Sequence, residues 1–212
     1  MLRRVIASAV AVATAIGVSN AAGTEAMPKP ASSMHVGAEV LGPYAFYDFC
    51  LRTPAQCRAD AKTASRVELT QQRWAELVEV NSIVNQTIVP KSDWDNYGVA
   101  DYWTIANKYG DCEDFALTKQ LFLRQRGWPM NALLITVVLD ENGAGHAILT
   151  VRTSHGDLVL DNRRSDIFAW TSTPYKFIKR QSTLDPRIWL TLDTSPPARG
   201  SDAVASTVST HR

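Results

Sequence analysis

The segment Cys112–Arg126 constrains the fold most, because helix signals bracket it at both ends. The turn-forming pair Gly110-Asp111 precedes it, Gly127 stands where a glycine commonly follows a helix, and Pro129 lies beyond. Apolar side chains cover much of its circumference: Phe115, Ala116, Leu117, Leu121, Phe122 and Leu123. A helix with so wide an apolar surface belongs at the centre of a fold.

Cys112 occupies the first turn of this predicted helix, where unpaired backbone N–H groups and the positive end of the helix dipole stabilise a thiolate. Asp111, Glu113 and Asp114 flank it, and their negative charge opposes thiolate formation. One interpretation is helix support, with Asp111 as an N-cap that contributes about 1 kcal/mol. The other is a hard-cation site, in which Asp111 and Glu113 supply oxygen ligands to Ca²⁺.

A second helix is predicted upstream over Val67–Ile88, where apolar residues recur at spacings of three to five. Thr70 or Ser65 would cap its start. Asn81 and Asn85 lie one turn apart on its apolar face. These two amides either hydrogen-bond to a neighbouring loop or are solvated.

Three β-like runs follow the cysteine helix, over Leu133–Asp140, His146–Thr153 and Leu158–Asn162. Segments with strong turn chemistry join them, which predicts an antiparallel meander. Further apolar residues are expected to close the sheet or its edge: Trp170, Tyr175, Phe177 and the run Ile188–Leu192. The pattern predicts an α+β fold in which the central helix packs on an antiparallel sheet.

Cys112, His146 and Asp161 follow one another in the order nucleophile, base and orienting carboxylate. His146 begins one predicted strand and Asp161 lies near the end of the next. The aromatic, turn-rich segments 90–98 and 101–105 precede the cysteine helix. They form either a wall of a cleft for an extended peptide or a packed connection. Together these features predict a cysteine enzyme.

The distance between His146 and Asp161 depends on the register of their strands. A two-residue turn at His155-Gly156 sets Asp161 opposite Thr150, roughly 13 Å from His146 at ~3.3 Å per residue, which is too far for a hydrogen bond. A reversal nearer Thr153-Ser154 sets Asp161 directly opposite His146. The triad is therefore expected to require the shifted register.

The proposed nucleophile also depends on how the cysteines pair. Cys50 and Cys57 flank a short loop with a proline inside it, so pairing them closes a small ring and leaves Cys112 free. The alternative is that these two are reduced and separately buried. A disulfide that used Cys112 would abolish the nucleophile, so we expect the Cys50–Cys57 pairing.

The N-terminal segment from Met1 to about Ala22 has the pattern of a secretory signal peptide. Arg3 and Arg4 form a positive n-region, and Val5–Val18 form an apolar stretch. This stretch is shorter than the ~20 residues that a membrane span requires, and no other run is long enough. We expect a cleaved, periplasmic or secreted protein with no membrane span after cleavage, in a compartment that permits disulfides.

The rest of the chain is expected to hold one domain. Residues 23–42, rich in Gly, Pro, Ala and Ser, read as a loose lead-in, residues 43–193 as the domain, and residues 194–212 as a disordered tail. The net charge of +1 becomes −1 (+1 − 2) without Arg3 and Arg4, and there is no basic block. This balance argues against a nucleic-acid partner.

The motifs resemble those of the bacterial transglutaminase-like cysteine proteinases, a family that includes the LapG-type periplasmic proteases. The matching residues are Gly110-Asp111-Cys112-Glu113-Asp114-Phe115-Ala116, His146-Ala147-Ile148-Leu149-Thr150-Val151 and Leu160-Asp161-Asn162. The resemblance covers roughly Tyr44–Leu192. It implies a papain-like, transglutaminase-like core, with Cys112 as nucleophile, His146 as general base and then acid, and Asp161 orienting the imidazole.

The same resemblance implies partners and a cofactor. LapG-type members use Ca²⁺ at the acids flanking the cysteine, which carries over to Asp111 and Glu113. They release biofilm adhesins from the outer membrane by cutting an alanine-rich site, and an inner-membrane receptor that senses cyclic di-GMP holds them inactive. We therefore expect an exported, calcium-dependent cysteine endopeptidase that acts on a protein, with a surface adhesin and such a receptor as possible partners. The alternatives are a transglutaminase- or amidase-type acyl transferase and a non-enzymatic, calcium-responsive periplasmic binding module.

Overall fold

The computed structural model describes residues 26–60 and 64–193. The predicted signal peptide at 1–22 and the predicted tail at 194–212 lie outside these residues, so both stay predictions. Within the described part of the chain, no helix is long and apolar enough to cross a bilayer.

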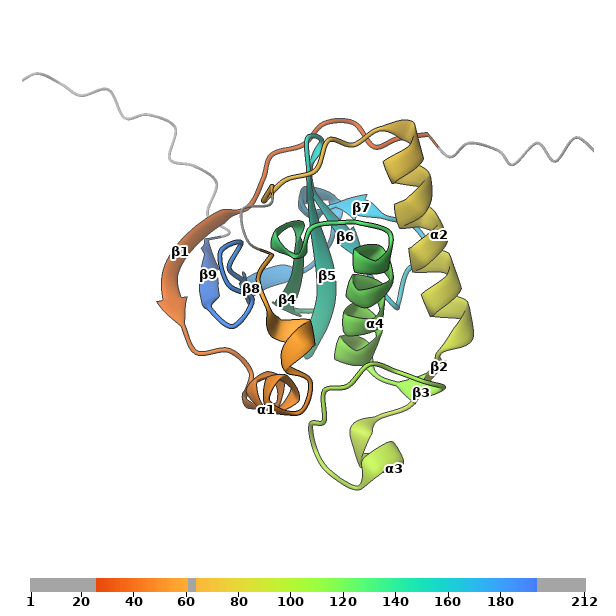
Figure 1. The fold of residues 1–212 in the computed structure, drawn as a ribbon, viewed down its shortest axis with the longest axis vertical. Helices are drawn as coiled ribbons and strands as arrows, with labels where there is room; N and C mark the ends of the chain where they lie inside the picture. Colours follow the sequence, from red (N-terminus) through yellow and green to blue (C-terminus); the bar gives the residue numbers. More distant parts are fainter. Residues whose placement is uncertain (1–25, 61–63, 194–212) are drawn as a thin grey trace, which may run out of the picture.

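The main sheet has seven strands in the order β1-β9-β8-β4-β5-β6-β7, and every neighbouring pair is antiparallel (Figure 1). The strands in this order are β1 (His35–Val40), β9 (Trp189–Asp193), β8 (Lys176–Gln181), β4 (Leu133–Leu139), β5 (Gly145–Thr153), β6 (Gly156–Leu160) and β7 (Phe168–Ala169). The predicted meander is confirmed as β4–β5–β6. The C-terminal strands β8 and β9 add to its other side, against β4.

The expectation of a loose lead-in over 23–42 was wrong for residues 35–40, which form the edge strand β1. This strand pairs with β9, from His35 opposite Asp193 to Val40 opposite Trp189. Most of its side chains are exposed, so its sequence carries no clear alternation of buried and exposed positions. Pairing with a strand at the far end of the chain orders the segment, and local composition does not report such pairing.

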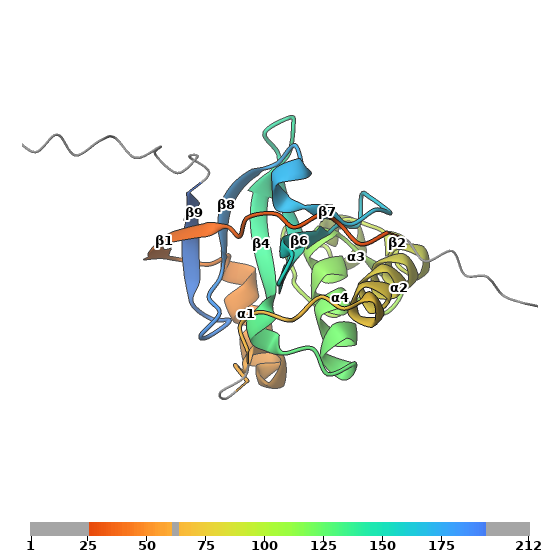
Figure 2. The same cartoon turned by 90° about the horizontal axis from the view of Figure 1, so that it is seen from above.

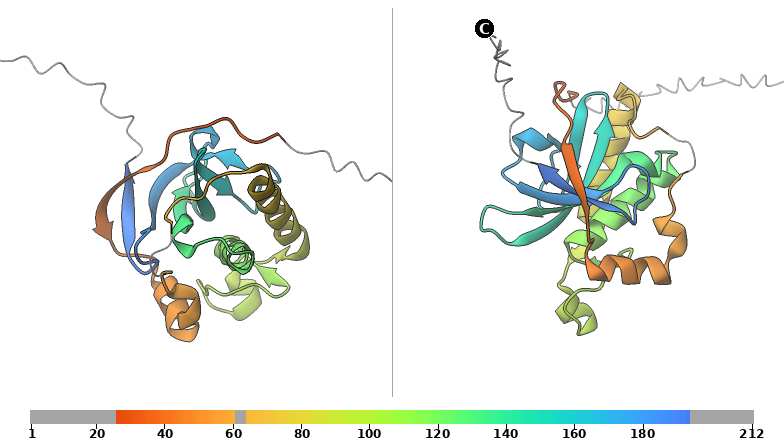
Figure 3. Two further views of the ribbon diagram at one scale, coloured as in Figure 1. Left: turned by 45° about the horizontal axis from the view of Figure 1, so that its top comes forward. Right: turned by 90° about the vertical axis from the view of Figure 1, so that its left-hand side faces the viewer.

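The helices lie mainly on one face of this sheet. They are α1 (Tyr44–Arg52), α2 (Gln71–Thr87), α3 (Asp93–Tyr97) and α4 (Cys112–Gln125), with 3₁₀ turns at Pro54–Cys57, Met130–Ala132 and Trp170–Ser172. Figure 2 shows α2 and α4 together on one side of the sheet, and the left view of Figure 3 shows α4 nearly end-on with α2 beside it. The predicted α+β architecture with a central cysteine helix is confirmed.

Both long helices begin and end close to their sequence signals. Thr70, and not Ser65, caps α2, where its hydroxyl accepts the N–H of Arg73 at 3.2 Å. At the end of α4, Gly127 has a positive φ of 79°, and its N–H donates to the carbonyl of Arg124. The next N–H, from Trp128, reaches back to the helix as well. This is the Schellman arrangement that glycine favours.

The sheet has apolar clusters on both faces. The larger cluster lies between the helices and the sheet, and it includes Leu77 of α2, Leu117 of α4 and Leu149 of β5. The smaller one covers the opposite face around Ile148 and Phe177. Alternation along β5 therefore assigns Leu149 to the helix side and Ile148 to the other side.

The expected disulfide is confirmed. Cys50 and Cys57 are bonded, which ties α1 to the 3₁₀ turn that follows it, and Cys112 is free.

We predict that Leu77→Ala lowers the free energy of unfolding by about 2–5 kcal/mol, because the Leu77 side chain is fully buried between α2 and the core. Urea denaturation measures the loss. Ile83→Ala on the same helix is the matched control, because Ile83 is 37% exposed and should cost far less. Equal losses in the two variants would contradict this account of the core.

Candidate active site

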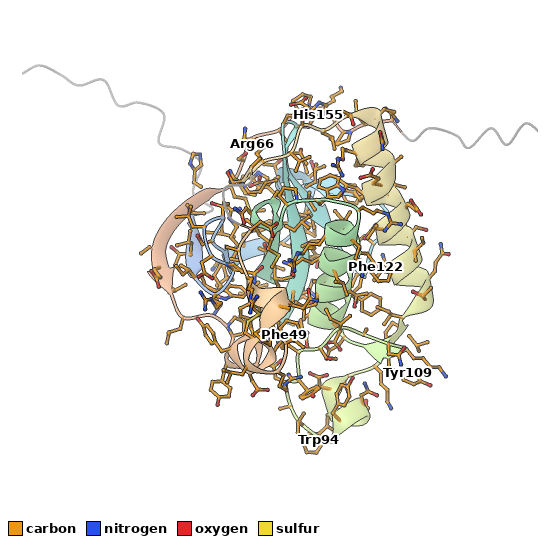
Figure 4. The ribbon with its side chains drawn as sticks, viewed as in Figure 1. Phe49, Arg66, Trp94, Tyr109, Phe122 and His155 are labelled. Carbon is orange, nitrogen blue, oxygen red and sulfur yellow. A yellow bond between two sulfur atoms is a disulfide. The ribbon has the colours of Figure 1, made fainter. Side chains whose placement is uncertain are left out.

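Two short strands and a glycine position the start of α4. β2 (Val89–Pro90) and β3 (Tyr109–Gly110) form a parallel pair directly before Cys112. Figure 4 shows Tyr109 near the start of α4 and Trp94 on α3, at the outer end of this region. Gly110 is required by space, because a Cβ there would lie 2.7 Å from the Cβ of Asp114. The backbone thus approaches the first turn of the helix closely.

The Cys112 sulfur lies against β5. It accepts the N–H of Ala147 at 3.4 Å, and its thiol donates to Glu113 Oε2 at 3.2 Å. Cys112 is half-buried and opens to a cleft of about 570 Å³. The other residues that line this cleft are Pro90, Lys91, Ser92, Asp95, Asp111, Asn162 and Arg163. The segment beginning at Pro90 therefore does wall a cleft beside the cysteine.

His146 and Asp161 form a fully buried pair. The imidazole Nε2 lies 2.9 Å from Asp161 Oδ1, and neither side chain is exposed. The hydroxyl of Tyr175 donates to the other carboxylate oxygen. Burial opposes ionisation of Asp161, but hydrogen bonds from His146, Tyr175 and the Arg163 N–H outweigh it and lower the pKa of Asp161 to about 2. The carboxylate is therefore ionised at neutral pH, and Nε2 carries the proton between them.

The other ring nitrogen, His146 Nδ1, is buried and has no hydrogen-bond partner among the described residues. His146 is the neighbour of Ala147 in β5, whose N–H meets the Cys112 sulfur. The structure thus brings the three predicted residues to one place: the pair His146–Asp161 by direct contact, and Cys112 through the adjacent strand residue.

Neither of the two predicted registers is correct. Leu149 pairs with Leu160 and Thr153 with Gly156, which places the reversal at Ser154-His155. Extending this register sets Asp161 level with Ile148, two residues along the same face from His146. The hydrogen bond forms across this diagonal, because Asp161 lies just past the end of β6. The expectation that the pair requires direct opposition was therefore wrong.

The acids around Cys112 lie close to two further acids, Asp93 and Asp101, which the sequence analysis did not predict as ligands. Carboxylate oxygens of Asp93, Asp111 and Asp114 lie within 4.8 Å of one another, and so do those of Asp93, Asp101 and Glu113. Both predicted ligands, Asp111 and Glu113, belong to this group. Each lies in a different set of three acids, and Asp93 is common to the two sets. The dense run of acids from Asp93 to Asp101 was the available signal, which the sequence prediction assigned to a cleft wall.

Asp93, Glu113 and Asp114 of this group are buried, Asp111 is half-buried and Asp101 is exposed, and several of their oxygens lack partners within the described part of the chain. Asp93 Oδ1, Asp111 Oδ1 and Asp114 Oδ2 are buried without a hydrogen-bond partner among the described residues. Burial, together with neighbouring acids, raises the pKa of Asp114 to about 8 and that of Glu113 to about 10. Asp111 occupies the N-cap position of α4 and two acids follow in the first turn, as predicted, but the Asp111 side chain makes no cap hydrogen bond to the helix. Buried carboxylate oxygens without partners suit a hard cation.

The Cys112 thiol is not the stabilised thiolate that the helix start predicts. Burial, followed by the charge of Glu113, raises the pKa of Cys112 well above its ordinary value. The helix dipole is outweighed because the sulfur is largely removed from water and lies beside an acid.

Comparison with known proteins gives the family. Residues 36–196 match the family model described as bacterial transglutaminase-like cysteine proteinase BTLCP. A search of curated proteins finds no match. A solved structure of Legionella pneumophila LapG is similar at 29% identity, covering 55% of this chain and 66% of that one, with a TM-score of 0.47.

The calcium-bound form of Legionella pneumophila LapG is similar at 26% identity, covering 62% of this chain and 73% of that one, again with a TM-score of 0.47. This chain spans 66% of the length of the first LapG chain, which is just under two thirds. The family model, by contrast, covers more than half of this chain. The chain therefore belongs to the bacterial transglutaminase-like cysteine proteinases.

Proposed function

We propose that this cysteine peptidase is an exported, calcium-dependent endopeptidase whose catalytic residues are Cys112, His146 and Asp161. The observation that carries the proposal is the buried His146–Asp161 hydrogen bond, which leaves Nδ1 without a partner among the described residues. That histidine directly precedes the residue whose N–H meets the Cys112 sulfur. The sulfur beside the backbone next to His146, together with the His146–Asp161 hydrogen bond, supports the roles of nucleophile, base and orienting carboxylate for these three residues.

The chemistry follows from these contacts. The Cys112 sulfur attacks the carbonyl carbon of a peptide bond while His146 Nδ1 takes the thiol proton. The backbone N–H of Cys112, which as one of the first N–H groups of α4 has no acceptor within the helix, stabilises the oxyanion. The C–N bond then breaks, His146 gives its proton to the leaving amine, and a thioester remains. Water attacks the thioester while His146 takes one of its protons. The C–S bond then breaks, the carboxylic acid is released, and His146 returns the proton to the sulfur.

Asp161 acts through His146. Because it stays ionised, it holds the proton on Nε2 and so keeps Nδ1 free to accept the thiol proton. It also stabilises the imidazolium that forms in each step.

The acidic group around α3 and the start of α4 fits calcium. Asp93, Asp111 and Asp114 offer buried oxygens without partners among the described residues, and Glu113 adjoins them through Asp93. When bound, the cation supplies positive charge beside the thiol and holds α3 against the start of α4. The family resemblance at Asp111 and Glu113 points to the same metal.

The location and partners follow from the sequence. The signal-peptide pattern and the Cys50–Cys57 disulfide support export to an oxidising compartment, which we take to be the periplasm. The resemblance to LapG-type members supports a protein substrate at the cell surface, such as a biofilm adhesin, and control by an inner-membrane receptor.

We predict that Cys112→Ala and His146→Ala each abolish release of surface proteins, because each removes a group that bonds to or exchanges a proton with the substrate. Comparing cell-surface and released proteins by mass spectrometry measures the loss. The matched control is His155→Ala, since His155 lies in the β5–β6 turn at the far end of the molecule from α3 (Figure 4). Unchanged release with Cys112→Ala would rule out the proposed nucleophile.

We predict that calcium raises the melting temperature of the purified protein by roughly 5–10 °C at about 100 times the dissociation constant, and that EGTA reverses the rise. Asp93→Asn should remove most of this shift, because Asp93 is shared by both acidic triples. Asp95→Asn, on the exposed side of α3, should keep it. Equal calcium responses in the two variants would exclude the site.

We predict that Asp161→Asn lowers stability at neutral pH by about 2 kcal/mol, and that the difference shrinks as the pH falls from about 4 to 2. The direction of this pH dependence follows from the lowered pKa of Asp161 in the folded protein. The Asp161 carboxylate stabilises the fold at pH values above the pKa of an unfolded aspartate, and this stabilisation is lost as the pH falls through about 2. Urea unfolding across this range measures it. Asp166→Asn, exposed in the same loop, should show no such pH-dependent difference.

A further inference from the structure

The loop that follows β6 carries the orienting carboxylate without support from the sheet. Pairing between β5 and β6 ends at Leu149 and Leu160, so the first part of β5, including His146, has no β6 partner. Asp161 begins the irregular segment 161–165 beside this open edge. Something other than the strand ladder must therefore fix its backbone.

Two amide side chains of α2 hold this segment. Asn85 Nδ2 donates to the carbonyl of Asp161 at 2.9 Å and to that of Arg164 at 3.1 Å. One turn earlier, Asn81 Nδ2 donates to the carbonyl of Ser165 at 2.8 Å and, at 3.4 Å, to that of Arg164. Of the two possible outcomes for these amides, bonding to a neighbouring loop is therefore the one observed.

The orientation of these amides is set by chemistry. A carbonyl oxygen only accepts hydrogen bonds, so the nitrogen side of each amide must face the loop. Asn81 is fully buried, and the side-chain oxygens of Asn81 and Asn85 have no hydrogen-bond partner among the described residues, so both amides are anchored through Nδ2 to the loop. The contacts therefore favour one backbone position for residues 161–165.

The same loop also lines the cleft beside Cys112. Asn162 and Arg163 line it beside Cys112, and the Arg163 N–H donates to Asp161 Oδ1 at 3.0 Å. On the other side, Arg163 pairs with Asp140 at 2.8 Å, which ties the loop to the β4–β5 turn. The loop is thus held between α2 and this turn, with the Asp161 carboxylate directed at His146.

We infer that Asn85 is a positioning residue for the proposed peptidase reaction. The hydrogen bond from its side-chain amide to the Asp161 carbonyl keeps the Asp161 carboxylate within hydrogen-bond distance of His146. Asn81 anchors the far end of the same loop. The inference rests on the proposed roles of His146 and Asp161, but the bond that it concerns can be observed without any turnover.

The test replaces Asn85 by leucine, whose side chain has the same number of heavy atoms branched at the same carbon but no N–H to donate, and by alanine as a smaller second variant. Gln86→Leu is the matched control, because Gln86 is the next residue, is exposed, and bonds only to Ser82 of its own helix among the described contacts. Urea denaturation first establishes which variants are folded, and the measurements below use those.

Two measurements report on the bond itself. The first is the low-field proton resonance of the His146 imidazole, assigned by its loss in His146→Gln. The second is the hydrogen-exchange rate of the Arg163 amide, which donates to the same carboxylate and serves if solvent exchange hides the imidazole proton. In the Asn85 variants the resonance should move upfield or broaden and the amide should exchange faster, whereas Gln86→Leu should match the wild type.

The kinetic expectation is a fall in kcat of roughly 10- to 100-fold for the Asn85 variants, as expected when a catalytic group is misplaced by about 1 Å. Asn85 variants that keep the wild-type resonance and the wild-type amide exchange would overturn the inference, and so would equal changes in Gln86→Leu. If Cys112→Ala proved active, the proposed catalytic roles would fail, yet the two spectroscopic readouts would still decide whether Asn85 holds Asp161.

Discussion

Burial of α4 is the constraint on which the site depends. Every residue from Glu113 to Gln120 is buried, with the helix packed between β5 and α2. A helix enclosed in this way cannot shift along its axis without opening the core. Its first turn is therefore held beside the start of β5, and the Cys112 sulfur meets the Ala147 N–H as a consequence of core packing.

The same burial has an electrostatic cost at the helix start. Glu113 and Asp114 lie in the buried part of α4, and their raised pKa values reflect carboxylates removed from water next to other acids. Asp93 of α3 adds a further acid to the group. Carboxylates removed from water without cationic partners destabilise the fold. Their arrangement is explained by the cation that we propose, which would join α3 to the start of α4.

His146 and Asp161 are held in a different way from Cys112. His146 lies in β5, supported by its pairing with Val138 of β4, whereas Asp161 lies past the last paired residue of β6. Strand geometry places the first, and side-chain hydrogen bonds from Tyr175 and Asn85 hold the second. This arrangement holds Cys112 on an enclosed helix, and it makes Asp161, on a tethered loop, the member of the proposed triad that remote substitutions should affect most.

The sequence by itself determined the elements whose signals are local: the bounds of α4, the end of α2, the β4–β5–β6 meander, and Cys112 at a helix start followed by His146 and Asp161. The helix predicted from Val67 begins only at Gln71, because Val67 bridges to Thr153 instead. Periodicity, caps and turns carry that information because each involves residues close together in the chain. Tertiary structure alone decided that residues 35–40 form an edge strand, that Asp93 and Asp101 join Asp111 and Glu113, and that the Asp161 contact crosses the strands diagonally. Each of these depends on segments far apart in the chain meeting in space, and a pairing of that kind leaves no periodic trace in either partner.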